Sequence, residues 1–163
     1  MLKIIFLDLD GCVVLPPKYN IIDPVAQKNL EVIIRNTEAK IVLSSSHRRD
    51  TVEETKAHLT TRLFEFNDRL VGVTIRGYTQ VVKNCSMSIP RGVEIKHWVD
   101  NYICRENNQG PYTKKIIRKD YNYVILDDAE DMLYEQRNHF VWVRPTKGLT
   151  LSDAYRAIKI LNG

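Results

Sequence analysis

No apolar run in this sequence is long enough to cross a membrane. A bilayer-spanning helix needs about 20 successive apolar residues, and none of the runs approaches that length. Residues 1–7 carry one lysine and lead directly into Asp8, so they lack the extended apolar region of a signal peptide. We interpret residues 1–7 as the first buried strand of the fold and expect no membrane partner.

Cysteine is also scarce. Cys12, Cys85 and Cys104 are widely spaced and odd in number, so they form neither a CxxC zinc pattern nor a disulfide framework. No pair among the four histidines has the spacing of metal ligands. These absences favour a reduced, cytoplasmic protein, and we do not expect Cys12 to be catalytic.

Internal repeats, low-complexity tracts and an evident linker are missing as well. The 163 residues have the length of one ordinary domain, and 44% hydrophobic with 27% charged residues is typical of a folded globular chain. We therefore expect a single domain over residues 1–163. The net charge of +4 is compatible with a phosphorylated or nucleic-acid partner without requiring one, and the oligomeric state stays open.

Apolar runs of strand length alternate with helix-period segments, which predicts an α/β fold with a mainly parallel central sheet. We expect strands at residues 3–9, 40–43, 70–75, 123–126 and 139–143, with one further short strand at about 80–83. We expect helices at residues 24–37 (N-cap Asp23, Val25 on the apolar face), 50–63 (capping pair Asp50 and Glu53), 91–103 and 152–161. Residues 13–22 contain two prolines and are predicted to form a loop or tight flap.

Acidic residues follow two of the predicted strands. Asp8 and Asp10 come after the first strand, and residues two apart in extended backbone point to the same side. Residues 127–131 place four more carboxylates after another apolar strand. Carboxyl ends of parallel strands meet at one ligand-binding edge, so this charge requires a cation, and oxygen ligands favour Mg²⁺ over Zn²⁺. For Asp128, Glu130 and Asp131 the alternative is that they cap a turn or a helix.

These segments resemble the motifs of the haloacid dehalogenase (HAD) superfamily of phosphatases. Residues 8–11 (DLDG) are similar to its first motif, DxDG, and residues 41–44 (IVLS) to its second, an apolar strand closed by Ser or Thr. Residues 126–131 match the acidic fourth motif in both its DD and its DxxxD form. The third motif is a lone Lys or Arg near a helix start, for which Arg91 is our choice and Lys96 the alternative.

Further segments narrow the resemblance. Residues 42–48, 91–98 and 148–150 are similar to a compact HAD branch found among RNA-repair-associated proteins. That branch usually has Trp where His47 stands, and His47 is near enough to the second motif to be a candidate for substrate contact.

The resemblance implies a Rossmann-like core with the active site at the carboxyl edge of the sheet. Asp8 would be the nucleophile that forms an aspartyl-phosphate, and Asp10 would act as acid and then as base. Mg²⁺ would be bound by Asp8, by the backbone carbonyl of Asp10 and by Asp127, with Asp128 or Asp131 as a further ligand or a neighbour of the ligands.

The resemblance also implies how the phosphate is held. Ser44 would hydrogen-bond the transferring phosphoryl group, and Arg91 would neutralise its charge. The candidate substrate-binding residues are Ser45, Arg48 and Lys96. Arg48, Arg49, Arg76 and Lys83 fall in predicted loops, where each either contacts a nucleic-acid backbone or is simply solvated. Candidates for base stacking are Tyr78, Tyr112 and Trp142, although Trp142 lies in an apolar strand and is expected in the core.

HAD enzymes select substrates partly with a cap domain, for which this chain has no room. Residues 12–22 and about 15 residues before Arg91 are too few for a packed domain. We expect an open site, suited to a nucleotide or to a polynucleotide-end phosphate, and thus a Mg²⁺-dependent phosphomonoesterase. The alternatives are a small-metabolite phosphatase closed by another subunit, and a phosphate- or nucleic-acid-binding module without turnover.

Overall fold

The computed structural model describes residues 1–18, 20–75, 80–82, 85–87, 89–103 and 120–163. Five strands form one sheet in the order β3-β2-β1-β6-β7, and every pairing within it is parallel. The strands are β1 (Leu2–Leu7), β2 (Lys40–Leu43), β3 (Leu70–Val73), β6 (Tyr121–Asp127) and β7 (Phe140–Trp142). The prediction of an α/β fold with a parallel central sheet is confirmed.

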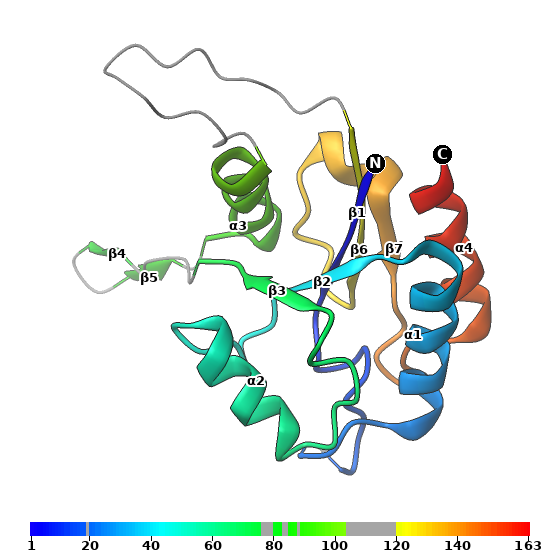
Figure 1. Ribbon diagram of the computed structural model, residues 1–163. Helices are drawn as coiled ribbons and strands as arrows, with labels where there is room; N and C mark the ends of the chain where they lie inside the picture. Colours follow the sequence, from blue (N-terminus) through cyan, green and yellow to red (C-terminus); the bar gives the residue numbers. More distant parts are fainter. Residues whose placement is uncertain (19, 76–79, 83–84, 88, 104–119) are drawn as a thin grey trace.

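Helices cover both faces of this sheet. α1 (Pro24–Thr37) and α4 (Leu151–Asn162) pack side by side on one face, and α3 (Arg91–Trp98), continued by a π-helical turn (Val99–Ile103), lies on the other (Figure 1). α2 (Val52–Thr60) contacts β3, and a short 3₁₀ helix (Tyr134–His139) precedes β7.

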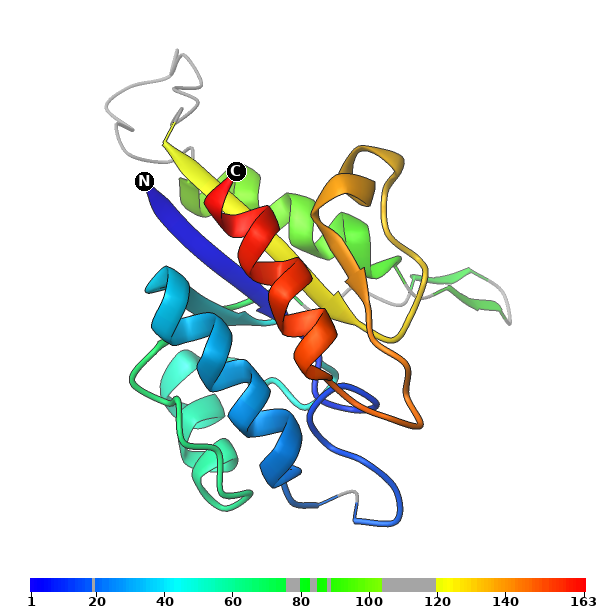
Figure 2. The same ribbon diagram turned by 90° about the vertical axis from the view of Figure 1, so that its right-hand side faces the viewer.

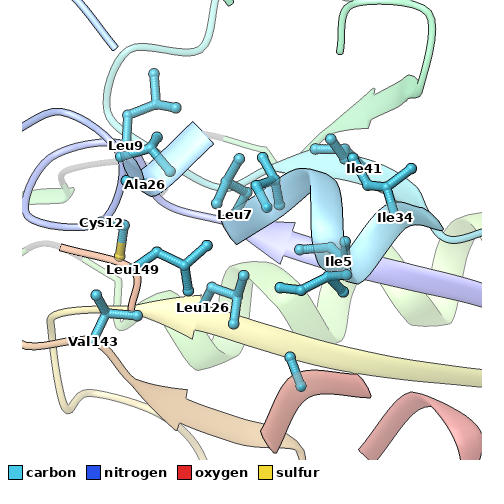
Figure 3. Close-up of a cluster of buried hydrophobic side chains, with 14 of the residues drawn as sticks. Ile5, Leu7, Leu9, Cys12, Ala26, Ile34, Ile41, Leu126, Val143 and Leu149 are labelled. Atoms are coloured by element: carbon cyan, nitrogen blue, oxygen red, sulfur yellow. The ribbon is translucent and has the colours of Figure 1, made fainter. Parts of the chain in front are cut away.

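The central strand β1 is buried on both sides, which explains its uninterrupted apolar sequence. Ile5 and Leu7 point into the cluster shared with α1 and α4, whereas Ile4 and Phe6 point into the cluster under α3. Figure 3 shows that the first cluster also takes in residues beyond the strand ends, among them Leu9 and Leu149. The core therefore extends up to the edge at which the acidic residues lie.

The residue that caps α1 is the one predicted from the sequence, whereas the residue that caps α2 is not. Asp23 caps α1 as predicted, since its carboxylate accepts the backbone N–H groups of Val25 and Ala26 at 3.0 and 2.9 Å. Val25 itself was predicted on the apolar face but is 69% exposed, a correction to that pattern. α2 is capped by Thr51, whose hydroxyl accepts the N–H of Glu54 at 3.1 Å, rather than by Asp50.

The first strand ends two residues earlier than predicted. The backbone carbonyl of Leu9 accepts the N–H groups of Cys12, Val13 and Val14, so the chain turns sharply immediately after Leu9. Between β3 and α3 the described residues form an antiparallel hairpin, β4 (Gln80–Val82) and β5 (Cys85–Met87). In the described part of the chain, no helix combines the length and the apolar character needed to cross a bilayer.

Candidate active site

Three carboxylates meet at the carboxyl ends of the neighbouring strands β1 and β6. Asp8 directly follows β1, Asp127 is the last residue of β6, and Asp128 follows it. Each contributes one oxygen atom to a group in which all these atoms lie within 4.8 Å of one another. Asp8 and Asp127 are buried, and the parallel pairing of β1 with β6 brings the two distant chain segments together. The structure thus brings these predicted site residues together.

The electrostatics of this group are unfavourable without a counter-charge. Burial, and next the charge of Asp8, raise the pKa of Asp127 to about 7. Burial also raises the pKa of Asp8, an effect that the guanidinium of Arg91 and a hydrogen bond from Ser45 oppose. The pKa of Asp128 is raised as well, mainly by burial. A site that holds ionised carboxylates in this way is suited to a cation.

The donor set fits the Mg²⁺ that the family resemblance implies. Asp127 Oδ1 accepts the N–H of Ala129 at 3.0 Å, whereas Asp127 Oδ2 is buried and has no hydrogen-bond partner among the described residues. A buried carboxylate oxygen without a donor is costly unless a metal ion or another charge faces it. Three carboxylate oxygens are also the ligand type that Mg²⁺ prefers.

Arg91 is a basic residue at this edge. It begins α3, and its Nη1 lies 3.2 Å from Asp8 Oδ1 and 3.6 Å from Asp127 Oδ2, and also donates to the backbone carbonyl of Ser44. Burial alone would lower the pKa of Arg91, but the charges of Asp127 and Asp8 outweigh it and raise the pKa. Lys96, the alternative, lies 3.4 Å from Asp100 and 3.8 Å from Glu135 instead. The geometry favours Arg91 as the third-motif residue.

Asp131 lies outside the acidic cluster that Asp8, Asp127 and Asp128 form. Its carboxylate accepts the backbone N–H of Arg91 at 2.9 Å, and its carbonyl accepts that of Gly92 at 3.3 Å. Asp131 therefore caps the helix that carries Arg91. Of the two candidates for a further metal ligand, Asp128 lies in the cluster and Asp131 does not.

Two serines follow β2 at the same edge. Ser44 and Ser45 are both buried, and the hydroxyl of Ser44 has no hydrogen-bond partner in the described part of the chain. The hydroxyl of Ser45 accepts the backbone N–H of His47 at 3.3 Å and hydrogen-bonds the Asp8 carboxylate. A buried hydroxyl without a partner is available to an incoming oxygen atom.

Arg48 was predicted to bind substrate, and the structure corrects this. Arg48 is buried, with 4% of the residue exposed. Its guanidinium binds four backbone carbonyls, those of Ser44, Ser45, Thr74 and Ile75, and the carboxylate of Glu94 at 2.9 Å. These bonds leave no N–H of Arg48 for a substrate. Arg48 instead links three parts of the fold: the serines after β2, the residues after β3, and α3.

Glu94 is a residue that sequence reasoning missed. It is buried, pairs with Arg48 and lies 3.9 Å from the Nε of Arg91. Its position three residues after Arg91 on a helix is the signal that could have revealed it, since residues so spaced share one helix face.

Asp10 lies at the rim of the site and contacts His47. Its carboxylate is 2.9 and 3.0 Å from His47 Nε2, and its side chain is 46% exposed. The carboxylate of Asp10 is not part of the group formed by Asp8, Asp127 and Asp128. His47 was a candidate for substrate contact, but its observed partner is Asp10.

Two more predictions concern residues near this edge. Trp142 was expected in the core, yet it is 38% exposed and its indole N–H donates to the carbonyl of Asp128 at 2.9 Å. Cys12 is buried, and burial raises the pKa of its thiol well above the usual value, which makes it an inert thiol. The loop candidates Arg76, Tyr78, Lys83 and Tyr112 lie outside the described residues.

The comparisons with known proteins agree with this geometry. Residues 4–154 match the family described as HAD domain in Swiss Army Knife RNA repair proteins. The comparison with curated proteins and the comparison with solved structures each found no match. The matched span includes the three carboxylates and Arg91, and membership of this family supports a hydrolase of the phosphatase type in general. The motifs, the parallel sheet and the match over most of the chain lead to one conclusion: this protein belongs to the HAD domains of the kind found in Swiss Army Knife RNA repair proteins.

Proposed function

We propose that this protein is a Mg²⁺-dependent phosphomonoesterase that acts on the phosphate of a nucleotide or of a polynucleotide end. The observation that carries the proposal is the meeting of Asp8, Asp127 and Asp128 at the sheet edge, with Arg91 3.2 Å from the Asp8 carboxylate. Asp8, Asp127, Asp128 and the backbone carbonyl of Asp10 would hold the ion. When bound, Mg²⁺ supplies the positive charge that lets an anionic carboxylate approach an anionic phosphate.

The residues of the chain then divide the reaction into two displacements. An Asp8 carboxylate oxygen attacks phosphorus, the bond from phosphorus to the leaving oxygen breaks, and Asp10 gives its proton to that oxygen. A water molecule next attacks the phosphorus of the aspartyl-phosphate while Asp10 takes a proton from it. Inorganic phosphate leaves, and the Asp8 carboxylate is restored.

The remaining site residues would bind and orient the phosphoryl group. The free hydroxyl of Ser44 donates to one phosphoryl oxygen, and Arg91 offers charge to the others. Ser45 would orient the Asp8 carboxylate or touch the substrate. Lys96, which lies with Asp100 and Glu135, stays a more distant candidate for substrate contact.

The substrate class follows from the family and from the form of the site. The family name refers to RNA repair proteins, and the described residues between β3 and α3 form a small hairpin, which leaves room for a large substrate. We take residues 1–163 as one domain and the cytoplasm as its location, where the free thiol of Cys12 would stay reduced.

Hydrolysis of p-nitrophenyl phosphate tests the proposal. We expect activity with Mg²⁺, and none with EDTA or in Asp8→Asn. A panel of 3′- and 5′-phosphorylated oligonucleotides, mononucleotides and sugar phosphates then identifies the substrate class. Turnover of sugar phosphates alone would replace the nucleic-acid assignment with a metabolite phosphatase, and full activity of Asp8→Asn would refute Asp8 as nucleophile.

A further inference from the structure

A pocket beside the acidic cluster has no part in the chemistry described above. It has a volume of about 290 Å³ and lies where β7 ends and its connection runs to the first turns of α4, a connection visible in Figure 2. Its lining includes one aromatic ring, that of Trp142, and three cationic side chains, those of Arg144, Lys147 and Arg156. This combination of an aromatic ring and cations is that of sites for single-stranded nucleic acid.

The ring of Trp142 is both exposed and held in place. Its neighbours in sequence, Val141 and Val143, are fully buried, whereas Trp142 is 38% exposed. Its indole N–H is bonded to the backbone carbonyl of Asp128 at 2.9 Å, so the polar atom is satisfied and the ring is anchored. An anchored ring with an open surface loses little conformational entropy when a base stacks on it.

The charge of the pocket is positive. Arg144 and Lys147 are exposed, and neither has an ion-pair partner within the described ranges. The one acid of the lining, Asp153, lies 3.7 Å from Arg156, but it also accepts the N–H and hydroxyl of Thr150 at the start of α4. Cations without fixed partners are available to phosphate groups.

The pocket adjoins the proposed catalytic group directly. Trp142 contacts the backbone of Asp128, and Pro145, in the same connection, packs against the DxDG turn. A Cβ built at Gly11 would lie 3.0 Å from Cβ of Pro145. If Asp8 holds the end phosphate of a polynucleotide, the nucleotides next to that phosphate would thus lie close to Trp142 and the cationic side chains.

We propose that this pocket binds the nucleotides next to the phosphorylated end of a single-stranded polynucleotide. A base stacks on Trp142, and the flanking phosphates contact Arg144, Lys147 and Arg156. The proposal rests on the proposed function for the position of the end phosphate. It adds the feature by which the protein selects a polynucleotide end over a smaller phosphate ester. A mononucleotide or a small metabolite lacks the flanking groups, so the pocket favours a polynucleotide end.

Charge reversal in the pocket tests this proposal through kinetics. Arg144→Glu/Lys147→Glu is compared with Lys28→Glu/Lys159→Glu, which makes the same charge change at exposed lysines outside the pocket. For the phosphorylated oligonucleotide that the wild type hydrolyses best, the pocket variant should raise KM about tenfold, with kcat nearly unchanged. The slope of log kcat/KM against log salt concentration should become shallower by about one or two. Hydrolysis of p-nitrophenyl phosphate should not change in either variant.

Direct binding gives a second, independent measurement. In Asp8→Asn the fluorescence of Trp142 should be quenched by a phosphorylated oligonucleotide and not by the matched mononucleotide at the same concentration. Trp142→Phe in this background should abolish the quenching, since the other tryptophan, Trp98, is buried.

The possible outcomes separate the pocket from the proposed function. An equal effect of the two double variants on the KM for the oligonucleotide would refute nucleotide binding by this pocket. Quenching that survives in Trp142→Phe would refute it as well. A pocket variant that weakens turnover of a phosphopeptide but not of the oligonucleotide would overturn it also. If the wild type hydrolyses no phosphomonoester, the proposed function fails, and the fluorescence titration still decides whether the pocket binds a polynucleotide.

Discussion

The imidazole of His47 holds the carboxylate of Asp10, with its Nε2 atom 2.9 Å from one carboxylate oxygen and 3.0 Å from the other. Asp10 is half-exposed at the rim of the site, so a hydrogen-bond partner restricts the rotation of its side chain. In the proposed reaction Asp10 must give its proton to the leaving oxygen. The contact therefore makes His47 a positioning residue for the acid step, rather than a group that touches the substrate.

We predict that His47→Ala affects substrates according to their leaving groups. General acid catalysis contributes most where the leaving oxygen is a poor one, so hydrolysis of an alkyl phosphate should fall about tenfold. Transfer of the phosphoryl group from p-nitrophenyl phosphate to Asp8, measured as the pre-steady-state burst of p-nitrophenol, needs little protonation of the leaving oxygen and should be nearly unchanged. His47→Gln should restore part of the loss because its amide N–H can replace the imidazole donor.

His97→Ala is the matched control, since His97 is exposed on α3 and should affect neither substrate. Equal losses in the phosphoryl-transfer step of the two substrates in His47→Ala would show that His47 does not position Asp10 as the acid.

Arg48 and Glu94 should behave as a coupled structural pair. Removing one partner of a buried ion pair leaves an uncompensated charge, so Arg48→Met and Glu94→Gln should each lower the free energy of unfolding by about 3–5 kcal/mol. Arg48→Met/Glu94→Gln should lose less than the sum of the same two single changes. Urea unfolding followed by circular dichroism measures this, and strict additivity would contradict the coupling.

The acidic cluster should destabilise the metal-free protein. At pH 8 Asp127 is ionised against its surroundings, because burial and Asp8 raise its pKa to about 7. A raised carboxyl pKa costs stability above that pKa, and the cost disappears as the pH falls towards the unfolded value. In EDTA at pH 8, Asp127→Asn should therefore melt at least about 2 °C higher than the wild type.

Mg²⁺ should reverse that order. It should raise the melting temperature of the wild type and leave that of Asp127→Asn unchanged, since the variant lacks a charged ligand. Equal stabilisation of both proteins by Mg²⁺, measured by differential scanning fluorimetry, would place the ion elsewhere.

Gly11→Ala should weaken the metal site. Gly11 has φ +71°, and a Cβ there would lie 2.3 Å from Asp128 Oδ2, so the carboxylate must move. Gly148→Ala is the control, because Gly148 has φ +64° but its Cβ would meet Leu15. Both variants should lose about 1–2 kcal/mol from the left-handed backbone. The Mg²⁺ concentration for half-maximal activity should rise only in Gly11→Ala, and an equal rise in both would exclude displacement of Asp128.

The residues that local patterns revealed are those placed by a single strand or helix. Asp8 and Asp127 could be predicted because each ends an apolar strand, and parallel pairing brings such ends together. Arg91 was chosen from the resemblance to the third HAD motif, a lone basic residue near a helix start, and it is the first residue of α3. The sheet, its helices and the acidic centre thus followed from hydrophobic periodicity and motif spacing.

What could not be predicted depends on contacts between distant segments. Arg48 has the sequence of a solvated loop cation, but β3 and α3 close over it and supply its partners. Trp142 is in an apolar strand, yet that strand is the edge of the sheet and ends at the active edge. Thr51 replaced Asp50 as the cap of α2, a shift of one residue that propensity does not distinguish.

Everything proposed for this site depends on Asp8 carrying the phosphoryl group, and trapping that intermediate tests it most directly. The protein is mixed with substrate and Mg²⁺, quenched within milliseconds in acid and treated with borohydride, which reduces an acyl phosphate to homoserine. Mass spectrometry of the peptide containing residues 8–11 should find homoserine in place of Asp8, and only when substrate and Mg²⁺ are both present. An unmodified Asp8 under conditions of full turnover, or homoserine in place of Asp10, would contradict the account.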